Sequence, residues 1–309
     1  MPDRRFCLYN VGAASQLLLC DDRVERDISF AFLTDLHLSP GVAHAGERYR
    51  KAVEWWAHAF GDVSQVVEKL LDEIAAAGVD LVVFGGDNID FFNKGTAEKL
   101  RDMCRARQLN TRFLIGNHDW ESDNTRFCTH EVDAPEREPN IHALSTAWNM
   151  PLPHDASEHG GIRFLTLPMR YCRNGHSSIA VLDDCYVDWF LDQLKENMPT
   201  VVFYHYPFPL PTLEHRLRAV WRGALPCAQL AENAVVFEAI STSPNIIATF
   251  CGHAHINSED PFADRGPWQF TTGAGADGIW RYVWISSQEP PKSLRIDGVP
   301  SVGDRQGES

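Results

Sequence analysis

Short apolar stretches that each end in acidic, amide or imidazole side chains constrain the fold of this chain more than any other feature. Five such stretches predict strands, at residues 30–34, 81–84, 112–115, 201–204 and 246–251. Amphipathic helices are expected before the last four strands, between Asp62 and Gly78 and at residues 97–108, 187–196 and 231–240. Helices that alternate with strands in this way indicate an α/β fold with parallel strands.

Each predicted strand delivers side chains that can bind a metal ion. The blocks are D-x-H, G-D, G-N-H-D, a single histidine and G-H-x-H, and they contain Asp35, His37, Asp87, Asn117, His118, Asp119, His205, His253 and His255. The carboxyl ends of parallel strands meet at one edge of a sheet, so we expect one site and not five. Carboxylates, an amide and imidazoles together suit a pair of divalent ions that acts on a phosphoryl group.

The five blocks, in this order, resemble those of the calcineurin-like metallophosphoesterases. The resemblance implies an α/β protein built as a four-layer α/β/β/α sandwich. It also implies two divalent or trivalent metal ions, of Mn, Fe or Zn. By this resemblance one ion is held by Asp35, His37 and His255, the other by Asn117, His205 and His253, and Asp87 bridges the two.

The same resemblance implies roles for the remaining polar residues. A metal-bound water or hydroxide would be the nucleophile. His118 would stabilise the transition state or protonate the leaving oxygen, and Asp119 would orient the ring of His118. These two residues are therefore the expected catalytic pair.

Some residues depart from one branch of the family. Protein Ser/Thr phosphatases have arginine before the G-N-H block and shortly after the G-D block, whereas this chain has Ile115, Phe91 and Phe92. The G-N-H-D block is more similar to that of small phosphodiesterases acting on cyclic nucleotides, glycerophosphodiesters and nucleotide-linked diphosphates. We therefore expect a hydrolase of phosphodiester or diphosphate bonds in a small molecule. A phosphomonoesterase and a catalytically silent metal-binding scaffold are the alternatives.

The expected organisation is an N-terminal extension at residues 1–27, one metallophosphoesterase domain at 28–286 and a flexible tail at 287–309. A loop-rich insertion is expected at about residues 120–178. Strand-like runs at residues 162–167, 179–182, 268–272 and 282–285 predict a second sheet packed on the first. The pattern leaves open whether residues 1–27 add a strand or form an arm, and what residues 39–61 do.

Net charge, apolar runs and cysteine usage limit the kinds of partner and the compartment that we expect for this chain. A net charge of −14 argues against binding of a nucleic acid polymer, which needs basic side chains, but a small phosphate ester remains a suitable substrate. No apolar run is long enough to cross a bilayer, so no membrane partner is expected. Eight scattered cysteines without a C-x-x-C pair indicate a reducing compartment, and we expect a cytoplasmic protein. The oligomeric state is left open.

Residues 273–278 match G-x-G-x-x-G, the spacing of dinucleotide-binding loops. Such a loop requires a helix directly after it, but the aromatic and β-branched run at residues 280–285 predicts a strand. The glycines are therefore interpreted as a tight connection between two strands.

Overall fold

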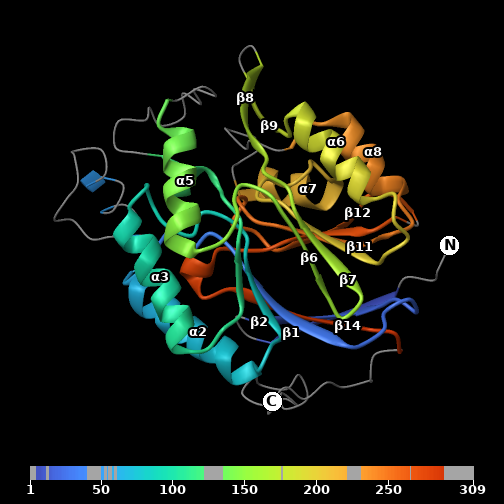
Figure 1. Ribbon diagram of the computed structural model, residues 1–309, viewed down its shortest axis with the longest axis horizontal. Coiled ribbons are helices and arrows are strands. Elements are labelled where there is room, and N and C mark those ends of the chain that lie inside the picture. Colours follow the sequence, from blue (N-terminus) through green and yellow to red (C-terminus); the bar gives the residue numbers. More distant parts are fainter. Residues whose placement is uncertain are drawn as a thin grey trace.

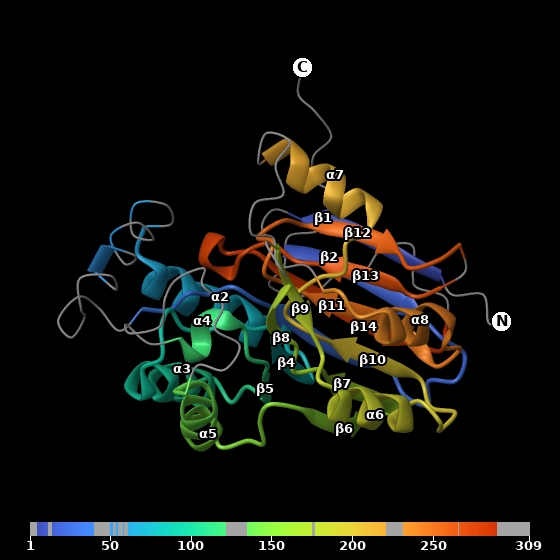
Figure 2. The ribbon, with the colours of Figure 1, turned by 90° about the horizontal axis from the view of Figure 1, so that it is seen from above.

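The computed structural model describes residues 5–11, 14–39, 50, 51, 54, 58, 61–121, 135–174, 177–220, 231–264 and 266–288. Two six-stranded sheets pack face to face, and helices cover the outer face of each (Figures 1 and 2). This arrangement confirms the α/β class and the four-layer sandwich.

The first sheet combines strands from both ends of the chain. Its order is β1 (Arg5–Val11), β2 (Ala14–Cys20), β14 (Trp280–Ser286), β3 (Ile28–Leu33), β4 (Leu81–Phe84) and β5 (Thr111–Phe113). Strands β3, β4 and β5 are parallel. The outer face is covered by α2 (Val63–Ala77), α3 (Lys94–Ala106) and α5 (Arg137–Trp148). Residues 1–27 thus contribute two strands to the first sheet. The addition of strands was one of the two alternatives that the sequence left open.

The second sheet has the order β12 (Ser258–Pro261), β13 (Trp268–Thr271), β11 (Ile246–Cys251), β10 (Thr200–Phe203), β7 (Ile162–Thr166) and β6 (Asp155–His159). Its four central strands are parallel. Helices α6 (Asp184–Gln193) and α8 (Ala234–Thr242) pack on its outer face, and α7 (Pro211–Val220) lies against β12.

Helix α2 begins and ends where the sequence predicts. The Asp62 carboxylate accepts hydrogen bonds from the backbone N–H groups of Ser64 (3.1 Å) and Gln65 (3.3 Å). These hydrogen bonds cap the N-terminus of the helix. The side chain of Gln65 returns a hydrogen bond to Asp62 at 2.7 Å. Gly78 ends the helix in the left-handed conformation, with φ of 65°.

Alternation along β3 separates two hydrophobic cores, one on each face of the first sheet. Phe30 and Phe32 point into the core between the sheets, whereas Ala31 and Leu33 face the outer helices. The inner core is aromatic: the ring of Phe30 meets those of Phe203 and Phe250 edge to face, with centroids 5.7 and 5.3 Å apart. This packing fixes the two sheets against each other directly behind the loops that follow β3, β10 and β11.

Two predicted strands differ from their expected places. Residues 282–285 were expected in the second sheet, but β14 lies in the first, between β2 and β3. Val283 and Ile285 fill the inner core from that side, because β14 pairs antiparallel with β3 and Val283 lies opposite Phe30. Residues 179–182 fall largely in β9 (Ser177–Val181), which forms a separate hairpin with β8 (Arg170–Asn174).

The expected loop-rich insertion contains a twelve-residue helix, α5. Ile141, Leu144 and Trp148 are buried on its inner side, and the Trp148 ring stacks on Phe113 with centroids 4.6 Å apart. Pro139 is tolerated because it lies in the first turn, where backbone N–H groups have no partner within a helix. In the part of the chain that the structure describes, no helix is both long and apolar enough to span a bilayer.

Candidate metal centre

The loops after five strands, three in the first sheet and two in the second, carry all the predicted site residues. Asp35 and His37 follow β3, and Asp87 follows β4. The short helix α4 (Asn117–Trp120) follows β5 and carries Asn117, His118 and Asp119. His205 follows β10, and His253 and His255 follow β11. The site therefore lies where the carboxyl ends of strands from both sheets meet.

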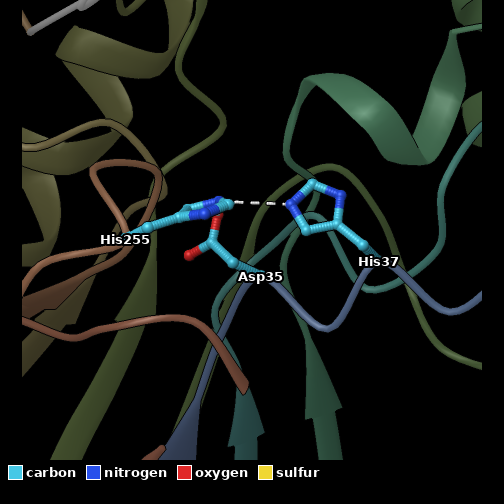
Figure 3. Close-up of side chains that lie close together, drawn as sticks. All are labelled: Asp35, His37 and His255. Carbon is cyan, nitrogen blue, oxygen red and sulfur yellow. Dashed lines mark hydrogen bonds and ion pairs between the residues drawn. The ribbon is translucent and has the colours of Figure 1, made fainter. Parts of the chain in front are cut away.

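Asp35, His37 and His255 form the first group of candidate ligands. The Nε2 atoms of His37 and His255 are 3.2 Å apart, and His255 Nε2 is 3.2 Å from Asp35 Oδ1 (Figure 3). The Asp35 carboxylate is held from behind, because Oδ2 accepts hydrogen bonds from Thr34 Oγ1 (2.8 Å) and the His253 backbone N–H (2.9 Å). Two imidazole nitrogens and a carboxylate oxygen thus converge on one point, as ligands of a metal ion do.

Asp87, His205 and His253 form the second group. His205 Nε2 is 3.2 Å from Asp87 Oδ2, while its Nδ1–H donates to the carbonyl of Gly85 at 2.8 Å. Because a carbonyl can only accept, Nδ1 carries the proton and Nε2 is the nitrogen that can bind a metal.

Asn117 and Asp87 complete the arrangement. The side-chain oxygen of Asn117 is buried and has no hydrogen-bond partner among the described residues, which fits an oxygen ligand of a metal ion. Asp87 also forms a third group with His37 and His118, in which the ligand atoms lie within 4.8 Å of one another. Asp87 therefore belongs to two groups of candidate ligands. A carboxylate that bridges two metal ions needs such a position. The residues therefore fit a two-metal centre, although the assignment of individual ligands stays a prediction.

The backbone at these residues is strained. Left-handed φ angles occur at five of the candidate ligands: Asp35 (55°), His37 (48°), Asp87 (51°), His253 (64°) and His255 (52°). Residues other than glycine rarely adopt this conformation, and such strain gathers at functional sites. Hydrogen bonds from the N–H of Asp35 to Gly86 O (2.9 Å) and from the N–H of His37 to Asp87 O (3.0 Å) hold two of these loops together.

Glycine is required where these loops meet. Gly86 has φ of 97°, and a Cβ atom there would lie 2.5 Å from Nδ1 of His205. The loop could not approach the imidazole so closely with any other residue.

Asp90, which the sequence analysis did not single out, holds the ring of His118. His118 Nδ1 donates to Asp90 Oδ1 at 2.7 Å, and His37 Nδ1 lies 3.6 Å from the same oxygen. We expected Asp119 to orient His118; Asp90 does so instead. The available signal was the spacing G-D-x-x-D, which places a second carboxylate three residues after Asp87.

Asp119 has a different task in the structure. Its carboxylate accepts hydrogen bonds from the backbone N–H groups of Asn88 (2.8 Å), Ile89 (3.0 Å) and Gly116 (2.8 Å). It therefore ties the loop after β4 to the loop after β5, and so holds Asp87 near His118. Burial and the neighbouring Asp87 raise the pKa of Asp119 to about 7.

The electrostatics separate the histidines into two kinds. Burial alone would lower the pKa of His118, but the Asp87 and Asp90 carboxylates raise it to about 10. Burial and the charge on His205 lower the pKa of His253 to about 3. Burial alone would raise the pKa of Asp35, but His255 lowers it to about 2. His118 is thus suited to hold a proton, and His253 to act as a neutral ligand.

The glycine-rich loop at residues 273–278 lies behind the first group. It forms the short helix η2 (Gly275–Asp277), not a dinucleotide-binding turn, and strand β14 follows it as expected. The backbone N–H of Gly275 donates to Thr34 O at 2.7 Å, and that of Ala276 donates to Asp35 O at 3.2 Å. The loop therefore supports the backbone of a candidate ligand.

A site of convergent imidazoles and carboxylates, at the carboxyl ends of parallel strands in two packed sheets, is typical of a metal-dependent phosphoesterase. The family model described as calcineurin-like phosphoesterase matches residues 28–257, and the chain belongs to this family. No curated protein matches the chain.

Similar solved structures have little sequence in common with this chain. A dimetal phosphatase from Danio rerio is 13% identical over 81% of this chain and 88% of its own, with a TM-score of 0.51. TT1561 of Thermus thermophilus is 12% identical over 82% and 92%, with a TM-score of 0.48. A purple acid phosphatase from yellow lupin is 11% identical over 85% and 47%, with a TM-score of 0.47. At 13% identity, the likeness to the Danio rerio protein shows the fold alone.

Proposed function

We propose that this phosphoesterase hydrolyses phosphodiester or diphosphate bonds of small molecules, of the class of cyclic nucleotides, glycerophosphodiesters and nucleotide-linked diphosphates. The observation that carries the proposal is the position of Asp87, which belongs to ligand groups on both sides and lies within 4.8 Å of His118. This arrangement suits a phosphoryl group held between two ions with an acid beside it.

The proposed ligands follow the two groups. Asp35, His37 and His255 would hold one ion, Asn117, His205 and His253 the other, and Asp87 would lie between them. The ions, of Mn, Fe or Zn, would supply positive charge to the phosphoryl oxygens and activate the attacking water.

His118 would deliver the proton to the leaving oxygen. Its Nδ1–H donates to Asp90, so Nε2 is the nitrogen that can reach a substrate. Because its pKa is raised to about 10, His118 is protonated at neutral pH and can act as a general acid.

We base the proposed preference for a diester on the apolar side chain that packs beside His118. Phe91 is buried, and its ring centroid lies 6.2 Å from that of His118. The backbone of Phe91 has φ of 61°, a strained value for a bulky residue. The neighbour of the proposed acid is thus apolar and offers no positive charge to the dianion of a monoester.

The test compares hydrolysis of bis(p-nitrophenyl) phosphate and p-nitrophenyl phosphate, with Mn²⁺ added and after chelation. We expect metal-dependent hydrolysis, with higher kcat/KM for the diester. The Asp87→Ala protein should lose about a hundred-fold or more in kcat/KM, because Asp87 belongs to two of the three groups of candidate ligands.

Asp21→Ala is the matched control. Asp21 is also a buried carboxylate, but it follows β2, whose carboxyl end lies at the opposite edge of the sheet from Asp35. It should retain activity. A higher kcat/KM for the monoester would show that the protein is a phosphomonoesterase and not a diesterase. Metal uptake without hydrolysis of either compound would favour a catalytically silent metal-binding scaffold.

A further inference from the structure

One aromatic ring outside the ligand set contacts both imidazoles of the second group. The ring centroid of Tyr206 lies 4.9 Å from that of His205 and 4.9 Å from that of His253, with interplanar angles of 79° and 66°. The centroids of His205 and His253 are themselves 5.2 Å apart. The three rings thus form a closed triangle in which each meets the others edge to face.

We propose that Tyr206 is a positioning residue that sets the orientation of the His253 and His205 rings, and thereby the affinity of the second ion site. This inference rests on the proposed two-metal function and extends it to a residue outside the candidate ligand groups.

Tyr206 is placed to act as a rigid support. It is 1% exposed and packs in the outer core of the second sheet with Phe208 and Cys251. Tyr206 directly follows His205 in the sequence, and Cys251 lies two residues before His253. The ring therefore connects a well-packed core to both imidazoles of the group.

Tyr206 acts together with other contacts of these two histidines. His205 has its Nδ1 bonded to Gly85 O, which restrains its ring independently. The hydrogen bonds from the backbone N–H of His253 to the Asp35 carboxylate restrain the strained main chain of His253. Rotation of the His253 ring is opposed by its packing against Tyr206 and His205. Because the centroid of the Tyr206 ring lies 4.9 Å from those of both imidazoles, we expect its loss to act on both rings of the second group.

The physical basis is the geometry of ligation. A metal ion requires the lone pair of an imidazole nitrogen to point at it, and groups that hold the ring in this direction raise affinity by about 10- to 100-fold. Edge-to-face contacts between rings have a preferred geometry, so two such contacts restrain ring rotation as well as position.

The test measures Mn²⁺ binding by isothermal titration calorimetry on the metal-free full chain. The wild-type protein should bind two ions. The His255→Ala protein, which lacks a ligand of the first group only, identifies the binding event that belongs to the second group. In the Tyr206→Leu protein, the affinity of that event should fall about ten-fold or more, while the first event stays within two-fold of wild type.

Two further variants distinguish the ring from its hydroxyl and from general packing. Tyr206→Phe keeps the ring and should bind both ions within two-fold of wild type. Phe208→Leu removes a ring of the same core that is equally buried but does not belong to the triangle. It should lower the melting temperature as Tyr206→Leu does, yet leave both affinities unchanged.

Several outcomes would overturn the assignment. Wild-type affinity for both ions in Tyr206→Leu, or an equal loss at both sites, would show that Tyr206 is only part of the core. An equal loss in Tyr206→Phe would assign the effect to the hydroxyl and not to the ring. Failure of the proposed function is seen separately, in the wild-type protein: uptake of fewer than two ions would remove the two-metal centre and the Tyr206 assignment with it.

Discussion

Asp90 lies between a candidate metal ligand, His37, and the proposed general acid, His118. Its carboxylate is fully buried, accepts the Nδ1–H of His118 and lies 3.6 Å from Nδ1 of His37. Burial alone would raise the pKa of Asp90, but the hydrogen bond from His118 and the nearby imidazole of His37 lower it, which favours the ionised carboxylate. A negative charge at this point favours the protonated form of His118 and fixes the direction of its ring.

Replacing Asp90 with asparagine should therefore change the pH dependence of catalysis. Asp90→Asn keeps the shape but removes the charge that helps raise the pKa of His118, so this pKa falls. The active form carries the proton, and the alkaline limb of kcat should move to lower pH. We also expect kcat to fall by about a hundred-fold, within the range of general acid catalysis.

The measurement is a pH–rate profile at saturating Mn²⁺ and diester. Asp102→Asn, on the exposed side of α3, removes the same charge far from the site and should leave the profile unchanged. An alkaline limb that stays in place in Asp90→Asn would contradict the role of His118 as the acid.

At the scale of elements, the site depends on how strands end. Strands β3, β4 and β11 each lead into ligand residues with positive φ, and neighbouring elements hold these strained turns in place. The helix η2 is such an element, because its first two N–H groups bond to the carbonyls of Thr34 and Asp35. A Cβ atom on Gly275 would lie 2.5 Å from Cδ2 of Leu36 and 3.0 Å from Thr34 O. Only glycine lets η2 approach the loop this closely.

Gly275→Ala should consequently displace the Asp35 loop and weaken the first ion site. We expect the affinity of the first group for Mn²⁺ to fall roughly ten-fold, as for other residues that support a ligand from behind. Calorimetric titration measures it directly. Gly95→Ala in α3, where the new Cβ meets only the side chain of Asn93 at 3.3 Å, should bind Mn²⁺ like wild type. Unchanged affinity in Gly275→Ala would mean that η2 does not control the position of Asp35.

At the scale of the whole molecule, the site exists only while the two sheets keep their relative position. Arg281 of β14 reaches from the first sheet to the second, where its guanidinium donates to Glu259 Oε1 (2.8 Å) and Thr271 O (2.7 Å). It also bonds to Thr272 and Ser15, and its side chain is fully buried. Arg281 thus hydrogen-bonds to polar groups of both sheets, and its own guanidinium is shielded from solvent.

Arg281→Met should be strongly destabilising. Removing one partner of a buried ion pair leaves an uncompensated charge on Glu259, and we expect the free energy of unfolding to fall by about 3–5 kcal/mol. Urea unfolding followed by circular dichroism measures the change. The exposed pair of Lys69 with Glu73 is the control, and Lys69→Met should leave the unfolding midpoint almost unchanged. A similarly small effect for Arg281→Met would show that the sheets do not depend on this contact.

Local pattern was sufficient for much of the fold and for the place in the fold where the candidate ligands gather. The boundaries of α2 follow from Asp62 and Gly78, and β4 and β11 occupy the predicted residues, because capping and apolar runs act over a few neighbouring positions. The strand-end blocks likewise predicted which side chains would gather, since the carboxyl ends of parallel strands must meet.

Other features depended on contacts between distant segments. The pattern of residues 282–285 fits either sheet, and its place beside β3 follows from the pairing of Val283 with Phe30 and from the shared inner core. The family resemblance implied Asp119 as the partner of His118, but the helical turn of α4 directs the Asp119 carboxylate to the backbone of Asn88 and Ile89. The ring of His118 meets Asp90, a residue 28 positions away, because only the packing of the loops after β4 and β5 brings the two together.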